Sequence, residues 1–279
     1  MSLLSKFREL NNFVKDDNHY ELICCQHKIG YIHKDIAKSL MLNIDGINLI
    51  NGAVYFKDRS QIKLNKKALE IAKILYQKGK LSALSKELFS CKKSIDSKEL
   101  FRLDRGLVEI LGIRGYGVHL IAYVKNKNSY KLWVPKRSKS KLVEPSKLDN
   151  TVAGGIKAGE DIYSAIKREA YEEAGISAKD FKYTKLTGTI NYNWKNKEYS
   201  IRRDTLYLFD MEVDESFKPT CSDGEVEDFK LMDWKEVLKL IQETDLVKSN
   251  CSLVFAHFLI RHGLMTNKNE KNYEEILRV

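Results

Sequence analysis

One stretch of the chain, Gly154 to Ile176, limits what this sequence can fold into more than any other part. It reads GGIKAGEDIYSAIKREAYEEAGI and follows the spacing G-x5-E-x7-R-E-x-x-E-E-x-G. The residues at the fixed positions are Gly154, Glu160, Arg168, Glu169, Glu172, Glu173 and Gly175. Ile162, Ala165 and Ile166 recur at helical spacing, which predicts a helix with one apolar face turned toward a core.

Three carboxylates gather on this predicted helix. Glu169, Glu172 and Glu173 are three and four residues apart, so a helix brings their side chains together. Like charges at these spacings cost about 0.2–0.5 kcal/mol per pair even when solvated. A positive charge is therefore expected beside them, either Arg168 or a bound Mg²⁺ or Mn²⁺, because hard cations prefer carboxylate oxygens.

The predicted helix has recognisable ends. Glu160 and Asp161 follow Gly159, and negative charge suits a helix N-terminus. Gly175 is placed to end the helix in a left-handed conformation. The pair Gly154 and Gly155 opens the loop before the helix, where glycine lets backbone amides and carbonyls approach a ligand closely.

These residues resemble the Nudix box, the signature of the Nudix hydrolases, at every fixed position. Ala170 stands where the family usually has a larger aliphatic residue. The resemblance implies that Glu169, Glu172 and Glu173 bind Mg²⁺ or Mn²⁺, with the Gly154 carbonyl as a further ligand. It also implies that Glu160 and Arg168 form a supporting ion pair, and that the reaction is the hydrolysis of a diphosphate.

Composition narrows the class of protein. The chain has 279 residues, 43% of them hydrophobic, and no run of 18 apolar residues that would cross a membrane. The N-terminus MSLLSKFREL lacks the apolar core of a signal peptide. Five cysteines without a C-x-x-C pair indicate reduced thiols, which predicts a cytoplasmic protein.

The formal net charge of +10 has three interpretations. It is compatible with nucleic-acid binding, with a lysine-rich surface, or with a basic rim that attracts a pyrophosphate. The lysines are spread along the chain, and no nucleic-acid-binding motif accompanies them. The sequence therefore favours a solvated surface and a small-molecule diphosphate substrate over nucleic acid.

The hydrophobic pattern divides the chain into an α+β N-terminal domain over residues 1–110 and a second domain over residues 111–279. In the first, helices are expected over Ser5–Val14, His33–Met41, Asn65–Lys78 and Leu100–Leu111, and strands over Tyr20–Cys25, Lys28–Ile32 and Val54–Lys57. The segment Ser82–Ser97 is expected to be a linker or an exposed helix pair.

The second domain alternates strands and helices. Strands are expected over Gly117–Val124, Tyr130–Pro135, Asn150–Val152, Lys185–Tyr192, Arg203–Val213 and Glu227–Met232, and helices over the box, Trp234–Ile241 and Cys251–His262. Strands around a helix that carries the metal site predict an α/β fold, namely an α/β/α sandwich with a mixed sheet, preceded by the smaller N-terminal domain.

The resemblance extends beyond the box. Six segments look like one Nudix subgroup: Phe101–Val124, Leu132–Lys141, Leu148–Gly155, Arg202–Val213, Asp223–Met232 and Asn250–Gly263. In that subgroup a DUF4743-type domain precedes the Nudix fold, and some fungal members continue into a thiamine pyrophosphokinase domain. Its members are similar to enzymes that hydrolyse thiamine diphosphate and its oxidised oxo and oxy analogues to the monophosphate and phosphate. The substrate expectation rests on this likeness alone.

Residues outside the box complete the candidate site. Family members use a Glu of the box or one outside it as the general base. Glu225 and Glu227 near the start of a predicted strand are candidates for that base or for an extra metal ligand, and they share one face if they alternate. Candidates for substrate contacts are Lys136, Arg137, Arg202, Arg203 and Gly155, since basic side chains and glycine backbone suit phosphate oxygens. His119 lies in an apolar strand and is interpreted as a satisfied core histidine.

Three functions remain open at this point. The first is the thiamine diphosphate hydrolase, and the second is a Nudix pyrophosphatase acting on ADP-ribose, a nucleotide sugar or a damaged nucleoside triphosphate. The third is a non-catalytic Nudix-like regulator that binds a nucleotide or nucleic acid, which is disfavoured because the box carboxylates are intact. The protein is expected to be a monomer or a homodimer.

Overall fold

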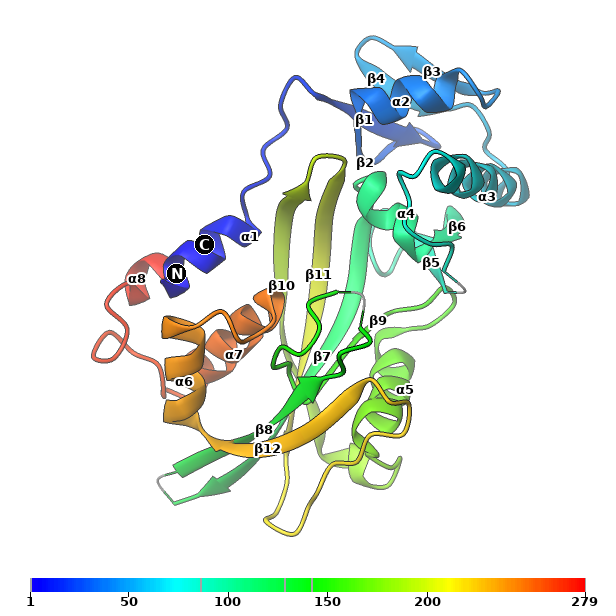
Figure 1. The fold of residues 1–279 in the computed structure, drawn as a ribbon. Coiled ribbons are helices and arrows are strands. Elements are labelled where there is room, and N and C mark those ends of the chain that lie inside the picture. The colour runs from blue at the N-terminus through cyan, green and yellow to red at the C-terminus, as the bar shows by residue number, and fades with distance from the viewer. Residues whose placement is uncertain (1, 86, 128, 142, 279) are drawn as a thin grey trace.

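The computed structural model describes all residues except 1, 86, 128, 142 and 279, and it shows two main sheets in two units (Figure 1). The first unit contains a four-stranded sheet in the order β2-β1-β4-β3. Its strands are β1 (His19–Cys24), β2 (His27–His33), β3 (Ile47–Ile50) and β4 (Ala53–Phe56). Strands β1 and β2 pair antiparallel, whereas β1 and β4 pair parallel.

Helix α2 (Lys34–Met41) packs on this sheet, and α3 (Gln61–Gln77) lies beside it and packs against β6 (Phe101–Asp104). Leu64, Ala68, Ile71 and Leu75 recur at helical spacing on α3, and all four are buried in the core of the first unit. Strand β6 forms a short hairpin with β5 (Leu88–Cys91), and α4 (Arg105–Ile110) leads into the second unit.

The second unit is built on a six-stranded mixed sheet in the order β10-β11-β7-β8-β12, with β9 paired to β7. Its strands are β7 (Arg114–Asn126), β8 (Ser129–Arg137), β9 (Val152–Gly155), β10 (Thr184–Lys197), β11 (Ser200–Glu212) and β12 (Val226–Asp233). Strand β7 runs parallel to β11 and antiparallel to β8 and β9.

Helices cover both faces of this sheet, so its central strand is apolar on both sides. On β7, Val118 and Leu120 face the core beneath α5 (Ile162–Ala174), and Ile121 and Tyr123 face the opposite core. The second core includes α6 (Trp234–Glu243), α7 (Ser249–Arg261) and α8 (Tyr273–Ile276). A 3-10 turn, η1 (Asp180–Tyr183), precedes β10. The predicted α/β sandwich with a mixed sheet is confirmed.

The first helix does not belong to the core of the first unit. Helix α1 (Leu3–Leu10) buries Leu3, Leu4 and Leu10 in the core around α6 and α7, and the Lys6 ammonium donates to the carbonyl of Ile241 at 3.0 Å. Figure 1 shows α1 beside α8 and away from the four-stranded sheet. The chain therefore starts on the second unit before it builds the first.

Two local predictions are wrong. The segment predicted as a helix over Leu100–Leu111 is strand β6 up to Asp104, and only then helix α4. The segment Ser82–Ser97, predicted as a linker or helix pair, contains β5, which pairs with β6; its residue 86 lies outside the described part. Asp104 ends the strand and caps the helix, because its Oδ1 accepts from the Gly106 amide at 2.8 Å.

Other features agree with the sequence. All five cysteines are free thiols. Within the described parts of the chain, no helix is both long and apolar enough to cross a bilayer.

Candidate active site

Helix α5 carries the box and has the ends that its sequence predicts. Asp161 is the N-cap residue, and its Oδ1 accepts from the amides of Tyr163 and Ser164, both at 2.8 Å. Gly175 ends the helix with φ of +64°, a left-handed conformation that glycine adopts without strain. Glu160 lies just before the cap and accepts from the Lys157 amide at 2.9 Å. The helix therefore has fixed ends, and its carboxylates have a fixed register.

Arg168 connects the helix to the loop in front of it. Its Nε and Nη2 donate to the two carboxylate oxygens of Glu160 at 2.6 and 2.9 Å, which forms the expected supporting ion pair. Nη1 donates to Glu169 at 2.6 Å and to Glu172 at 3.2 Å, and Nη2 also reaches the Gly155 carbonyl at 3.2 Å. One guanidinium thus holds two of the three box carboxylates and the glycine loop.

Glu169 fills the space that Gly154 leaves open. A Cβ atom on Gly154 would lie 2.0 Å from the Glu169 carboxyl carbon, so any larger residue there would displace this carboxylate. Glu169 is buried, and burial raises the pKa of its carboxyl even though Arg168 opposes this shift. The glycine is therefore required so that the Glu169 carboxylate can lie against the β9 backbone.

Glu173 is the buried carboxyl of the box that has no cationic partner among the described residues. Its Oε2 accepts from the Ala153 amide at 2.8 Å. Burial raises its pKa well above the usual value, and the nearby charge of Glu169 raises it further, with smaller contributions from Asp149 and Glu225. A cation bound beside Glu173 would therefore favour the ionised form of its carboxyl.

The two glutamates beside β12 have different surroundings. Glu225 bonds to the Lys141 ammonium and lies near enough to Glu173 to raise its pKa. Glu227 pairs with Lys136 at 3.1 Å and accepts from a backbone amide, and these hydrogen bonds lower the pKa of its carboxyl. The register of β12 shifts between Val226 and Asp228, so the simple alternation expected for Glu225 and Glu227 is interrupted. Glu225 is the one with an electrostatic link to the box.

Comparison with known proteins identifies this arrangement. Residues 115–250 match the family model described as the NUDIX domain.

This chain contains a NUDIX domain.

Two relatives from Arabidopsis thaliana extend the match. Nudix hydrolase 20, chloroplastic, is 35% identical over 248 residues, and Nudix hydrolase 24, chloroplastic, is 34% identical over 242 residues. Each match covers 85% of this chain and 66% of the relative, so the chain spans just under two thirds of their length. A share of 85% exceeds what residues 115–279 contain, so the likeness includes part of the N-terminal unit.

Two further comparisons are shorter or more distant. A Nudix hydrolase of Deinococcus radiodurans is 40% identical over 55 residues, which is 20% of this chain and 32% of that protein. A crystal structure of DR0079 from the same organism aligns with a TM-score of 0.43 at 18% identity, covering 61% of this chain and 96% of that one.

A cavity of about 110 Å³ lies beside the NUDIX box. The box loop contributes its backbone from Ala153 to Gly155, and the start of α7 contributes Lys248 and Asn250. The N-terminal unit contributes Phe89 and Glu109 to the same cavity. Sequence reasoning named Gly154 and Gly155 but not Phe89, Glu109, Lys248 or Asn250, because these four meet the box only in the folded chain.

Of the four basic residues predicted to contact phosphate, Arg202 alone lines this cavity, and its guanidinium bonds to Glu109 at 3.0 Å. Lys136 is half-exposed and pairs with Glu227. Arg203 donates to the Gly112 carbonyl at 3.1 Å and stacks over the ring of Tyr31, which joins the NUDIX domain to the first unit.

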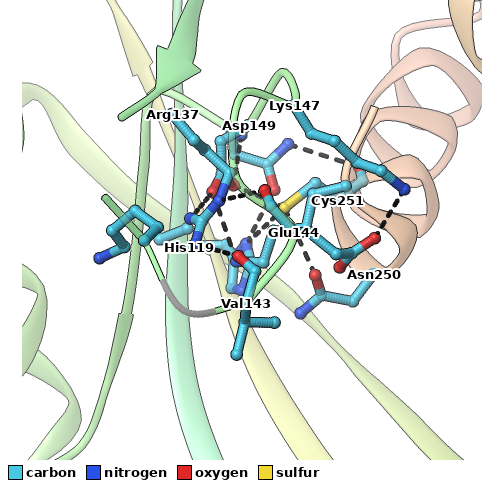
Figure 2. A network of polar contacts seen from close by, with 12 residues as sticks. His119, Arg137, Val143, Glu144, Lys147, Asp149, Asn250 and Cys251 are labelled. Carbon is cyan, nitrogen blue, oxygen red and sulfur yellow. Dashed lines mark hydrogen bonds and ion pairs between the residues drawn. The ribbon is translucent and has the colours of Figure 1, made fainter. Parts of the chain in front are cut away.

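Arg137, the fourth, is buried. It donates to the carbonyls of Val143 and Glu144 at 2.8 and 3.1 Å and to Asp149 at 2.6 Å (Figure 2). The guanidiniums of Arg137 and Arg203 are thus engaged by protein acceptors, and a phosphate contact remains a prediction for each.

Figure 2 shows a second polar cluster around Asp149. The donor atoms of His119, Asp149 and Cys251 lie within 4.8 Å of one another, which is close enough for a metal ion. Asp149 already pairs with Arg137 and with Lys248 at 3.3 Å. Burial raises the pKa of the Cys251 thiol, which donates to Asp149 at 2.6 Å. With its carboxylate neutralised twice and its thiol protonated, this cluster is a hydrogen-bond network rather than a cation site.

Proposed function

We propose that this protein is a divalent-metal-dependent hydrolase that cleaves a diphosphate linkage. The observation that carries the proposal is Glu173, a buried carboxyl beside Glu169 with no cation partner among the described residues. An unpaired buried carboxyl does not stabilise a helix, but it can bind a hard cation such as Mg²⁺. The NUDIX domain and the two plant relatives named Nudix hydrolases support the same activity.

The residues present fit Mg²⁺ or Mn²⁺. Glu169, Glu172 and Glu173 would hold the ion, and the Gly154 carbonyl would add a neutral oxygen, which together form the oxygen donor set that these cations prefer. When bound, the ion neutralises phosphoryl charge and lowers the pKa of a coordinated water. The chain prepares this site in advance, because Arg168 holds Glu169 and Glu172 in place from the loop side.

The general base is proposed to be Glu225 or Glu227, with the box glutamates as the other source. Glu225 is favoured because its charge reaches Glu173, so it lies on the same side as the box. Lys141 holds the Glu225 carboxylate, and Lys136 holds Glu227. We propose that these two lysines bind phosphate oxygens when a substrate replaces one of their present partners.

The substrate is proposed to be thiamine diphosphate or one of its oxidised oxo and oxy analogues, which yield the monophosphate and phosphate. Support comes from the resemblance of six segments to that subgroup and from the N-terminal unit, which we propose to be of the DUF4743 type. The second candidate is a nucleotide-type diphosphate such as ADP-ribose, a nucleotide sugar or a damaged nucleoside triphosphate. We further propose a cytoplasmic monomer or homodimer.

The deciding experiment measures turnover of thiamine diphosphate, its two oxidised analogues and a nucleotide panel with Mg²⁺ and with Mn²⁺, detecting phosphate and monophosphate products. The expected result is fastest turnover for a thiamine-type substrate and none with a chelator. Faster turnover of ADP-ribose would reject the substrate. Full activity of Glu172→Gln or Glu173→Gln would reject the metal chemistry.

A further inference from the structure

The cavity beside the box is formed by both units of the protein. Phe89 from β5 and Glu109 from α4 line it together with Gly155 and the start of α7. Phe89 packs directly on the box loop, because a Cβ atom on Gly155 would lie 2.5 Å from its ring. The volume of about 110 Å³ is of the same order as the ~150 Å³ cavity that holds benzene in an engineered protein, so the cavity has the size needed for an aromatic group.

The charged side chains of the cavity wall already have partners. Arg202 pairs with Glu109 and Asp204, Lys248 pairs with Asp149, and Arg105 pairs with Glu87. A phosphate placed there would have to compete with these carboxylates. A neutral polar ring would not, so the cavity fits the organic end of a substrate whose phosphates lie at the box.

His119 offers the cavity one hydrogen-bond acceptor. Its Nδ1 lies 2.7 Å from Oδ1 of Asn150, and the Asn150 amide nitrogen points to the Cys251 carbonyl at 3.5 Å. The Nδ1 atom is therefore the donor and carries the proton. Burial lowers the pKa of His119 to about 4, and the charge of Lys248 contributes to this shift.

The other ring nitrogen, Nε2, then has a free lone pair at neutral pH. No described residue forms a hydrogen bond with Nε2. His119 lines the cavity, and only 3% of its surface is exposed. Asn250 lies on the same wall; its amide nitrogen makes one long contact, to the Tyr192 hydroxyl at 3.4 Å, and its oxygen accepts from the Cys251 thiol at 3.5 Å. The wall thus presents one acceptor and one weakly engaged amide.

We propose that this cavity binds the nitrogen heterocycle of the diphosphate substrate, that Nε2 of His119 accepts a hydrogen bond from an exocyclic amino group of that ring, and that Phe89 of the N-terminal unit closes the pocket. The inference rests on the proposed diphosphatase function. It assigns the N-terminal unit a role in substrate choice. Aminopyrimidines and aminopurines share the required chemistry.

The test measures binding by calorimetry to the full chain in the presence of a chelator, so that no turnover occurs. The probes are thiamine monophosphate, AMP, and purine riboside monophosphate, which is AMP without its amino group. We expect wild type to bind at least one amino-bearing probe, and to bind AMP about tenfold more tightly than its deamino analogue if the pocket takes a purine. His119→Phe should weaken the amino-bearing probe about tenfold and remove the discrimination between AMP and its analogue.

Phe89→Ala changes a half-buried position, so the variant should remain folded and bind the probe severalfold more weakly. This variant tests the pocket even if His119→Phe does not fold. His27→Phe, in the distant β1–β2 hairpin, is the matched control and should bind like wild type.

Three results would overturn the proposal: no binding of either amino-bearing probe at millimolar concentration, unchanged binding in both variants, or an equal loss for AMP and its deamino analogue in His119→Phe. Because binding is measured without metal, these failures are separate from a failure of hydrolysis. A protein that hydrolyses diphosphates but shows no effect of His119 or Phe89 would refute the pocket and leave the proposed function intact.

Discussion

Replacing Glu173 by Gln removes a buried carboxyl whose ionisation is opposed by burial and by Glu169, and it keeps the acceptor that bonds the Ala153 amide. Carboxylates on adjacent helical turns, about 6–8 Å apart at an effective dielectric of about 20, repel by on the order of 2 kcal/mol. Glu173→Gln should therefore stabilise the metal-free protein by about this amount at neutral pH, or by roughly 4–8 °C in Tm. The same change should lower kcat/KM at least about 100-fold, since it removes a carboxylate proposed to bind the metal.

The sign of the pH dependence follows from the raised pKa of Glu173. Between its ordinary value of 4.5 and the higher pKa in the folded state, the folded protein binds more protons than the unfolded chain. Metal-free wild type therefore loses stability as pH rises above about 4.5, whereas Glu173→Gln does not. The difference between the two proteins should vanish at pH 4 and grow toward pH 8.

Bound metal should reverse the order of stability. At a Mg²⁺ concentration of 100 Kd, wild type gains about 2.7 kcal/mol, and the variant gains less because it has lost a ligand. The assay is chemical denaturation at pH 5 and pH 8, with chelator and with Mg²⁺. Glu70→Gln, an exposed position on α3, is the control and should show neither effect. Equal stabilisation of both proteins by Mg²⁺, or no gain for metal-free Glu173→Gln at pH 8, would refute the reasoning.

Three further outcomes can be measured. Gly154→Ala should lower kcat at least about tenfold, because its Cβ displaces the Glu169 carboxylate, while circular dichroism stays unchanged. Arg168→Lys should lower kcat about tenfold, since a single ammonium cannot span its partners, and an unaffected rate would contradict the assigned positioning role. Asp149→Asn should cost about 3–5 kcal/mol of unfolding free energy at pH 7 by leaving Arg137 buried without its carboxylate. Burial opposes ionisation of Asp149, but neighbouring cations hold its pKa well below the usual range, so this stability should persist above about pH 4 and fade in denaturation measurements as pH falls.

The box could be predicted in detail because its information is local. Helix ends depend on the cap residues Asp161 and Gly175, and carboxylate spacing depends only on the helical period. The long strands of the NUDIX domain were predictable for the same reason, since their apolar runs are long enough to show a pattern.

The hairpin of β5 and β6 was missed because each strand has four residues and is stabilised by its partner rather than by its own pattern. The position of α1 was missed for a related reason. Leu3, Leu4 and Leu10 show an amphipathic helix, but nothing in the sequence states which core it covers. Pairing and packing partners are non-local properties, and a single sequence does not encode them in any short window.

Charged residues outside the box show the same limit. Arg137 and Arg203 were chosen as phosphate ligands because guanidinium suits phosphate, yet their donors are engaged by protein acceptors. A sequence displays a charge but not the partner that neutralises it. His119 was interpreted as a satisfied core histidine, which holds for Nδ1, while Nε2 has no partner among the described residues.

The box and the cavity wall differ in how far their charges are paired. Arg168 neutralises Glu169 and Glu172 from the loop side, but no described basic residue reaches Glu173. The metal-free fold therefore opposes ionisation of Glu173, and a bound cation would offset that cost. Arg202, in contrast, is fully compensated within the cavity wall. The uncompensated carboxyl therefore lies at the box, and the charges of the cavity wall are already paired, which supports the proposal that metal and phosphate bind at the box and a neutral ring binds in the cavity.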